Sequence, residues 1–130
     1  MQSMLHEELT GSIIKVFYSV YNELGFGFLE KVYQNAMMIA LKDEGFKVEA
    51  QKKIEVRFLG EIVGEYYADI VVNDLVILEL KAAESLIHEH ELQLINYLKA
   101  TEMEVGLLLN FGSKPELRRK IFDNDKKKPI

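Results

Sequence analysis

Apolar residues in the first part of the chain recur every three or four positions. Between residues 5 and 24 they lie at helical spacing, at Leu9, Ile13, Val16, Phe17, Val20 and Leu24. This spacing predicts an amphipathic helix. Gly25 and Gly27 predict a turn after it, because glycine adopts positive φ at little steric cost. A second helix is expected from about 29 to 44, ended by Gly45, so the chain opens as a helical hairpin.

After Gly45 the apolar spacing changes from that of a helix to the alternation of a strand. Residues 47–58 and 62–72 alternate between apolar and polar, and Leu59-Gly60-Glu61 between them is typical of a turn. A third strand, over 75–81, follows a turn at Asn73-Asp74. Two such turns in succession predict an antiparallel three-stranded meander.

The second half of the chain predicts a crossover connection. A helix is expected from about 88 to 100, and the continuous apolar run at 105–109 suits a strand buried on both faces. A strand, a helix and a returning strand form a parallel β-α-β unit. Residues 117–122 fit either an edge strand or a short helix beginning at Pro115, and we favour the strand. Residues 125–130 carry three lysines and are expected to form a frayed basic tail.

The length and composition fit one globular domain, which we expect to span residues 1–124 of the 130. No apolar run approaches the roughly 20 residues needed to cross a bilayer. The N-terminus lacks the basic start and apolar stretch of a secretory signal, so a cytoplasmic protein is expected. The absence of cysteine leaves oxygen and imidazole as metal ligands. The net charge of −5 argues against a broad basic surface for nucleic acid, although a metal site itself concentrates carboxylates.

Candidate chemistry lies at the end of the third predicted strand. Alternation places Glu79 and Lys81 on one face, and charged side chains on an apolar strand need a partner or a metal. Taken alone, this pair is more simply a surface ion pair where the strand reaches solvent. Asp69, ten residues before Glu79 in the preceding strand, changes that interpretation, because a second carboxylate there is equally out of place.

The register of this hairpin decides whether the two carboxylates meet. Asp69 and Glu79 pair directly only if the connection holds an odd number of residues, for example 73–75. A two-residue turn would place Asp69 opposite Leu78, on the wrong face, unless a bulge corrected the register. Two carboxylates so close repel each other unless a proton or a divalent cation lies between them. The metal hypothesis therefore predicts a three-residue loop or a bulge.

Oxygen ligands of this kind suit Mg²⁺ or Mn²⁺, held by Asp69, Glu79 and the backbone carbonyl of Leu80. Such a site supports phosphodiester hydrolysis, because the metal lowers the pKa of a bound water and stabilises charge on the phosphate. Lys81 can orient that water or neutralise the developing negative charge.

Three short motifs resemble known families. Asp69…Glu79-x-Lys81 resembles the core motif of the PD-(D/E)xK nuclease superfamily, and residues 93–97 resemble the Gln-x-x-x-Tyr motif of its RecB-like branch. Residues 27–33 are similar to the signature of the small GxxExxY proteins. The resemblance spans about residues 9 to 122. It implies a restriction-endonuclease-like α/β fold, in which a mixed sheet is flanked by helices.

The resemblance also implies further site residues. Glu30 would reach the metal beside Asp69 and Glu79, with Gly27 and Tyr33 in support, although a glutamate at a helix start needs no such role. Ala68 stands where the superfamily name has proline, a position that often varies. Gln93 and Tyr97 lie four residues apart and share a helix face. They would bind phosphate or position Lys81 and the attacking water, or else form a buried amide and phenol bonded within the fold.

Two functions are compatible with these patterns. The leading hypothesis is a nuclease that uses Mg²⁺ or Mn²⁺ to hydrolyse DNA or RNA; the alternative is a catalytically weak or inactive nuclease fold that binds nucleic acid or assembles with proteins. Retention of every motif residue favours the first, and the acidic net charge favours the second. A homodimer is plausible because so small and acidic a domain offers little surface for gripping a duplex. His88 and His90, two residues apart, do not match a helical zinc pair and are interpreted as helix-start residues.

Overall fold

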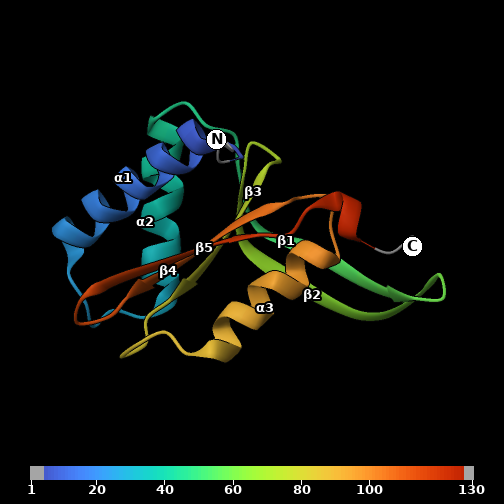
Figure 1. The fold of residues 1–130 in the computed structure, drawn as a ribbon. Coiled ribbons are helices and arrows are strands. Elements are labelled where there is room, and N and C mark those ends of the chain that lie inside the picture. The colour runs from blue at the N-terminus through green and yellow to red at the C-terminus, as the bar shows by residue number, and fades with distance from the viewer. Residues whose placement is uncertain (1–4, 128–130) are drawn as a thin grey trace, which may run out of the picture.

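The protein is described by a computed structural model that covers residues 5–127. Two helices, α1 (Glu7–Leu24) and α2 (Glu30–Asp43), precede a sheet whose strands are interrupted once by a helix (Figure 1). The later elements are β1 (Val48–Phe58), β2 (Glu61–Val72), β3 (Val76–Lys81), α3 (His88–Lys99), β4 (Val105–Phe111), β5 (Pro115–Ile121) and the short 3-10 helix η1 (Asn124–Lys126). Across residues 5–127 no helix has the length and apolarity required to span a bilayer.

The five strands form one mixed sheet in the order β1-β2-β3-β4-β5. Neighbours are antiparallel except β3 and β4, which are parallel and joined through α3. The predicted meander and β-α-β crossover are therefore confirmed, as is the opening helical hairpin. The ambiguous segment after Phe111 is a strand, which pairs with β4 from Pro115 onward.

Each face of the sheet carries its own apolar core. Helices α1 and α2 cover one face and α3 covers the other (Figure 1). The first core includes Phe17, Tyr33 and Leu78, and the second includes Ile77 and Leu94. Because β3 contributes to both, its residues 76–80 are all buried, as the apolar run predicts.

The connection between β2 and β3 settles the register at the candidate site. Val72 pairs with Val76 and Ile70 with Leu78, so residues 73–75 form a three-residue loop. Asn73 and Asp74 both adopt positive φ, at 53° and 56°, in the left-handed region that these two residue types tolerate. The same register places Asp69 opposite Glu79, and the odd-numbered connection that the metal hypothesis requires is confirmed.

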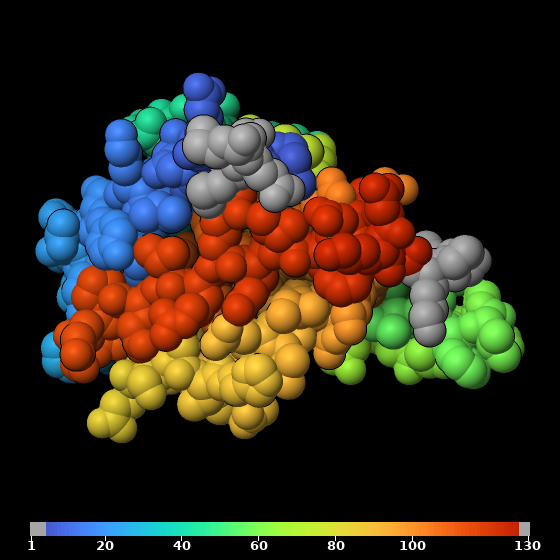
Figure 2. Space-filling model, viewed as in Figure 1, coloured from blue at the N-terminus to red at the C-terminus, as the bar shows by residue number. Residues whose placement is uncertain are grey.

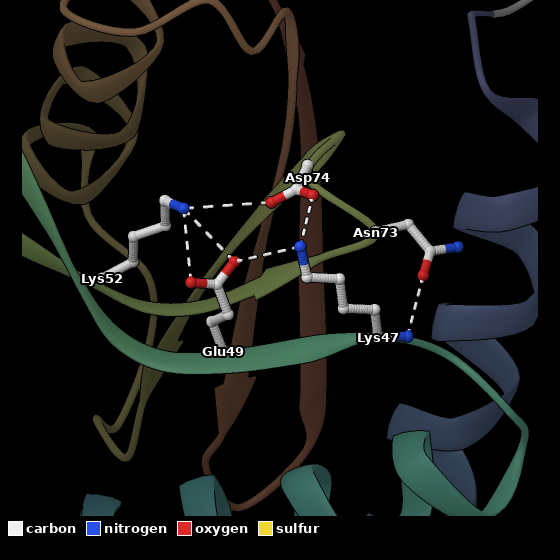
Figure 3. A network of polar contacts seen from close by, with 5 residues as sticks. All are labelled: Lys47, Glu49, Lys52, Asn73 and Asp74. Carbon is white, nitrogen blue, oxygen red and sulfur yellow. Dashed lines mark hydrogen bonds and ion pairs between the residues drawn. The ribbon is translucent and has the colours of Figure 1, made fainter.

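Contacts from the start of β1 hold this loop in place (Figure 3). The backbone N–H of Lys47 donates to Asn73 Oδ1 at 2.9 Å, and its ammonium reaches Asp74 Oδ2 at 2.7 Å. Lys52 bonds to Glu49 and lies 3.9 Å from Asp74. These charges are exposed, so their pairing contributes less than the backbone geometry to the choice of a three-residue loop.

The end of the chain differs from the expected frayed tail. Residues 124–126 form η1, and the Lys127 ammonium donates to the carbonyls of Thr101 and Met103, at 2.8 Å each. These carbonyls follow the end of α3, where backbone acceptors lack helical partners, so a lysine is well suited to bind them. Residues 125–127 thus have a defined conformation in the structure, and residues 128–130 of the expected tail lie outside the described part of the chain.

Candidate active site

Asp69 and Glu79 lie side by side across the β2–β3 hairpin. Glu79 is only 5% exposed, and its Oε1 accepts the backbone N–H of Asp69 at 3.4 Å. The Asp69 carboxylate in turn accepts the backbone N–H of Leu80 at 2.8 Å. Each carboxyl group is thus oriented by the other residue's strand, which fixes the pair more tightly than side-chain rotamers alone would.

The regular alternation of side chains between the two faces of the sheet is interrupted in β2 at Asp69. Ala68 and Ile70 are two apart and would normally share a face, yet Ala68 packs in the core under α3 and Ile70 in the core under α1 and α2. The opposing residue on β1, Gln51, has a φ of 53°. A local irregularity of this kind re-aims side chains and recurs next to active sites. It lets Asp69 face a pocket on the α2 side while Glu79 stays under α3.

That pocket, of about 190 Å³, is lined by residues from three elements: Glu30, Lys31, Gln34, Gln51, Asp69 and Leu80. The structure therefore brings Glu30, Asp69 and Leu80 to one cavity. The Gln51 amide bridges its walls, donating to Gln34 Oε1 at 2.7 Å and to Asp69 Oδ1 at 3.4 Å.

Gln34 and Gln51 are pocket residues that the sequence patterns missed. Gln34 lies one helical turn after Glu30 and therefore shares its helix face, a spacing by which the sequence could have indicated it. The structure shows that its side chain is buried. Gln51 gives no such signal, because its orientation depends on a positive φ within a regularly alternating strand.

The Tyr33 side chain fixes the loop that precedes α2. Its hydroxyl donates to the Gly25 carbonyl at 2.8 Å and accepts the Phe28 N–H at 3.3 Å, while its ring stacks on Phe111 with centroids 4.1 Å apart. The side chain is fully buried. Gly27, between the two bonded residues, has a φ of 109° that side chains rarely permit. Tyr33 thereby ties the loop before α2 to the core, and Glu30 is the first residue of that helix.

On the opposite face of the sheet, α3 presents Gln93 and Tyr97 to a second, larger groove. The Tyr97 ring lies 5.6 Å from the Tyr66 ring. Its phenol is near enough to Glu79 and Asp69 for their negative charges, after burial, to raise the pKa of Tyr97 to about 12. The structure thus brings Tyr97 to the carboxylate pair and leaves Gln93 on the groove wall beside it.

The comparison with protein families agrees with this geometry. A model of the PD-(D/E)XK nuclease superfamily matches residues 7–120, most of the chain. The chain belongs to the PD-(D/E)XK nuclease superfamily. Its α/β, restriction-endonuclease-like fold is confirmed.

The crystal structure of SSO0001 is similar in fold to this superfamily member. The TM-score is 0.56 and the identity 19%, over 74% of this chain and 51% of that one. This chain therefore corresponds to about half of the SSO0001 chain. No curated protein matches the sequence.

Electrostatics at the carboxylate pair oppose the ionisation of Glu79. Burial, followed by the charge of Asp69, raises the pKa of Glu79 to about 9, and Lys81 offsets this only in part. Without a cation, Glu79 of this superfamily member therefore holds a proton at neutral pH. A divalent cation between the two groups can replace that proton, since it stabilises both charges.

The ligand set is an open one. Within residues 5–127 no three Asp, Glu or His side chains lie close enough to hold one ion together. Mg²⁺ does not require such a cage, because it keeps several waters and is bound through one or two carboxylates plus substrate phosphate. Asp69 and Glu79 supply two carboxyl groups of this kind, and Glu30 and Leu80 line the same pocket as Asp69.

Lys81 is half-buried at the end of β3, opposite Asn110 of β4. The buried Asn110 amide accepts the Ala83 N–H at 2.9 Å and donates to the Ala83 carbonyl at 3.0 Å. It also donates to Glu116, which accepts the Leu86 N–H at 3.2 Å. This network fixes the loop that follows Lys81, and nothing in the local sequence indicates it.

The two histidines have the predicted place at the start of α3. His88 is its exposed first residue, and His90 Nδ1 accepts the Ile87 N–H at 3.2 Å. This bond satisfies one of the free N–H groups at the helix N-terminus. Their interpretation as helix-start residues is confirmed.

Proposed function

We propose that this superfamily member is a metal-dependent nuclease whose Asp69 and Glu79 bind Mg²⁺ or Mn²⁺, with the Leu80 carbonyl as a further ligand. The observation that carries the proposal is the three-residue connection at 73–75, which sets the two carboxyl groups beside each other. Membership of the superfamily supports it independently. A divalent cation there would lower the pKa of water and neutralise charge on a phosphate.

The other site residues have separate roles in binding and orienting the substrate. Lys81 follows Glu79 on the same face and carries the positive charge that orients the attacking water or stabilises the phosphate in the transition state. Tyr97 and Gln93 approach from α3 and hold a phosphate oxygen or position Lys81. Glu30 acts from the start of α2, through water, on the side of the pair that Asp69 faces.

We also propose that this chain belongs to the GxxExxY proteins, a group within the superfamily. The support for this assignment is the bonding of the signature residues: Tyr33 holds the turn that contains Gly27 and thereby sets the first residue of α2, Glu30. The glycine, the glutamate and the tyrosine thus act together to present one carboxylate to the pocket.

Cleavage assays test the enzyme directly. Single-stranded and duplex DNA and RNA are incubated with the protein in Mg²⁺ or Mn²⁺, beside Glu79→Gln and Lys81→Ala. Glu23→Gln and Lys114→Ala, at exposed positions on α1 and after β4, are matched controls. The cleavage rate should be unchanged in the controls and should fall by roughly two orders of magnitude or more in the two site variants. Activity that persists in both site variants would identify a contaminant and refute the assignment.

A binding or assembly module without turnover is the second candidate. The observation that favours it is that Glu30, Asp69 and Glu79 do not gather into one three-carboxylate site in the described structure. Metal binding by the wild type, combined with no cleavage of any of the four substrates, would support this module over the nuclease.

A further inference from the structure

A groove runs between the β1–β2 hairpin and α3. One wall is β1 from Lys53 to Arg57 with Tyr66 of β2, and the other is α3 with the segment after it, closed at one end by Phe122 and η1. The hairpin projects past the rest of the molecule, as its green tip shows in Figure 2. The groove volume is about 1220 Å³, larger than the roughly 300–1,000 Å³ of small-molecule sites. This size suits a polymer better than a metabolite.

The groove concentrates positive charge in an acidic protein. Five basic residues line it, against Glu55 and Glu89, whereas the whole chain has a net charge of −5. The basic residues are Lys53, Arg57, Lys99, Lys126 and Lys127. Lys127 is engaged with backbone carbonyls, but the ion pairs of Lys53, Arg57 and Lys126 are exposed and weak. These three and Lys99 are therefore available to a polyanion.

Aromatic rings lie among these charges. Tyr66 is 48% exposed and pairs with Tyr97, and Phe122 lies further along, with the Lys99 ammonium 5.4 Å from its ring centre. Cationic grooves with exposed rings bind single strands, because unpaired bases stack on the rings while the backbone follows the charges. A duplex keeps its bases stacked inside and cannot use the rings in this way. The exposed ring of Tyr66 therefore suits a single strand better than a duplex.

We infer that this groove binds single-stranded nucleic acid and leads it to the carboxylate pair, an inference that rests on the proposed nuclease function. Tyr97 connects the two sites, because it lines the groove and packs in the same core cluster as Ile77, which lies two residues before Glu79 on β3.

Binding is measured by fluorescence anisotropy in EDTA, where no cleavage occurs, using labelled 15-nucleotide DNA, the same RNA sequence, and the corresponding duplex. Tyr66→Ala should weaken single-strand binding at least about fivefold. Lys99→Ala should lower the salt slope by about 0.7, because one phosphate fewer is neutralised by the protein. Tyr67→Ala, equally exposed at 49% but outside the groove, and Lys114→Ala are matched controls that should bind as the wild type does.

The outcomes separate the groove from the enzyme. Single strands bound more tightly than duplex, with weaker binding confined to Tyr66→Ala and Lys99→Ala, would support the groove even if Mg²⁺ and Mn²⁺ produce no cleavage. Unchanged binding in both groove variants, preference for the duplex, or no binding of any oligonucleotide would overturn it. Cleavage of single strands with the wild-type KM in both variants would also overturn it while leaving the nuclease in place. DNA and RNA probes distinguish the two sources of a single strand.

Discussion

At the scale of single residues, the site depends on a carboxyl group kept in the protein interior. Glu79 lies under α3 beside Asp69, and both its burial and that neighbour oppose its ionisation. Buried carboxyl groups with raised pKa values cluster at functional sites, because they destabilise the fold unless something binds them. Function therefore accounts for Glu79 better than stability does.

The raised pKa of Glu79 predicts how the metal-free protein responds to pH. The folded state binds the proton up to a pKa of about 9, against an ordinary value of 4.5, so it holds the proton more tightly than the unfolded chain. This contribution to stability is fully present below pH 4.5 and is lost as the pH rises toward 9. In EDTA, the Tm of the wild type should fall from pH 6 to pH 9.

Glu79→Gln keeps the shape and removes the ionisation, so its Tm should exceed that of the wild type at pH 8 and vary less with pH. Circular dichroism melts across this range measure the difference, with Glu23→Gln as the control at an exposed site. Parallel Tm profiles for the wild type and Glu79→Gln would show that Glu79 is not the titrating group.

Tyr33 is the residue on which the start of α2 depends. Tyr33→Phe keeps the ring packed on Phe111 but leaves the Gly25 carbonyl and the Phe28 N–H without their partner. The expected loss in the free energy of unfolding is about 1–3 kcal/mol, measured by urea titration. Tyr18→Phe, on the exposed part of α1, should change it by less than about 0.5 kcal/mol. Equal losses in the two variants would contradict this role for the Tyr33 hydroxyl.

At the scale of elements, the position of α3 against the sheet depends on a glycine. A Cβ on Gly106 would lie 2.6 Å from Leu94 Cδ1, so its absence lets α3 approach β4 closely. This approach sets how far Tyr97, one turn after Leu94, stands from the carboxylates. A packing contact in the core thus bears on the geometry of the site.

A double-mutant cycle tests this contact. Gly106→Ala should destabilise the fold by about 1–3 kcal/mol through overpacking, and Leu94→Ala by about 2–5 kcal/mol through a cavity. The double variant should lose less than the sum of the two, because the shortened side chain makes room for the new methyl group. Additive losses, measured by urea unfolding, would show that the two residues do not share this space.

Local patterns predict the elements well and their long-range consequences poorly. Helical and strand periodicity predicted α1 to α3 and β1 to β5 within a few residues, but not η1. The metal hypothesis predicted a three-residue loop or a bulge after β2, and the structure has the three-residue loop. The positive φ of Gln51, the bond from Gln51 to Gln34 and the anchoring of Lys127 were not predictable. Each of these features depends on a contact with residues far away in the sequence, and the pattern of neighbouring residues does not predict such contacts.

At the scale of the whole molecule, the acidic net charge is a poor guide to nucleic-acid binding, because charge is unevenly distributed over the surface. The average of −5 hides a groove in which basic residues outnumber acidic ones, and this groove forms only when the β1–β2 hairpin and α3 come together. The net charge that argued against nucleic acid therefore describes the whole surface, and not the groove that we propose as the binding site for a single strand. Sequence composition cannot distinguish these two, because it carries no positions in space.

A calorimetric titration with Mn²⁺ tests directly whether Asp69 and Glu79 form a metal site. Wild-type protein should bind the ion at one site, and Asp69→Asn should weaken that binding by more than about tenfold. Loss of a residue that only hydrogen-bonds to a metal ligand already weakens metal binding by about this much. Asp43→Asn, at the exposed end of α2, is the matched control and should bind as the wild type does. Equal affinity of the wild type and Asp69→Asn for Mn²⁺ would contradict a metal site built on Asp69 and Glu79.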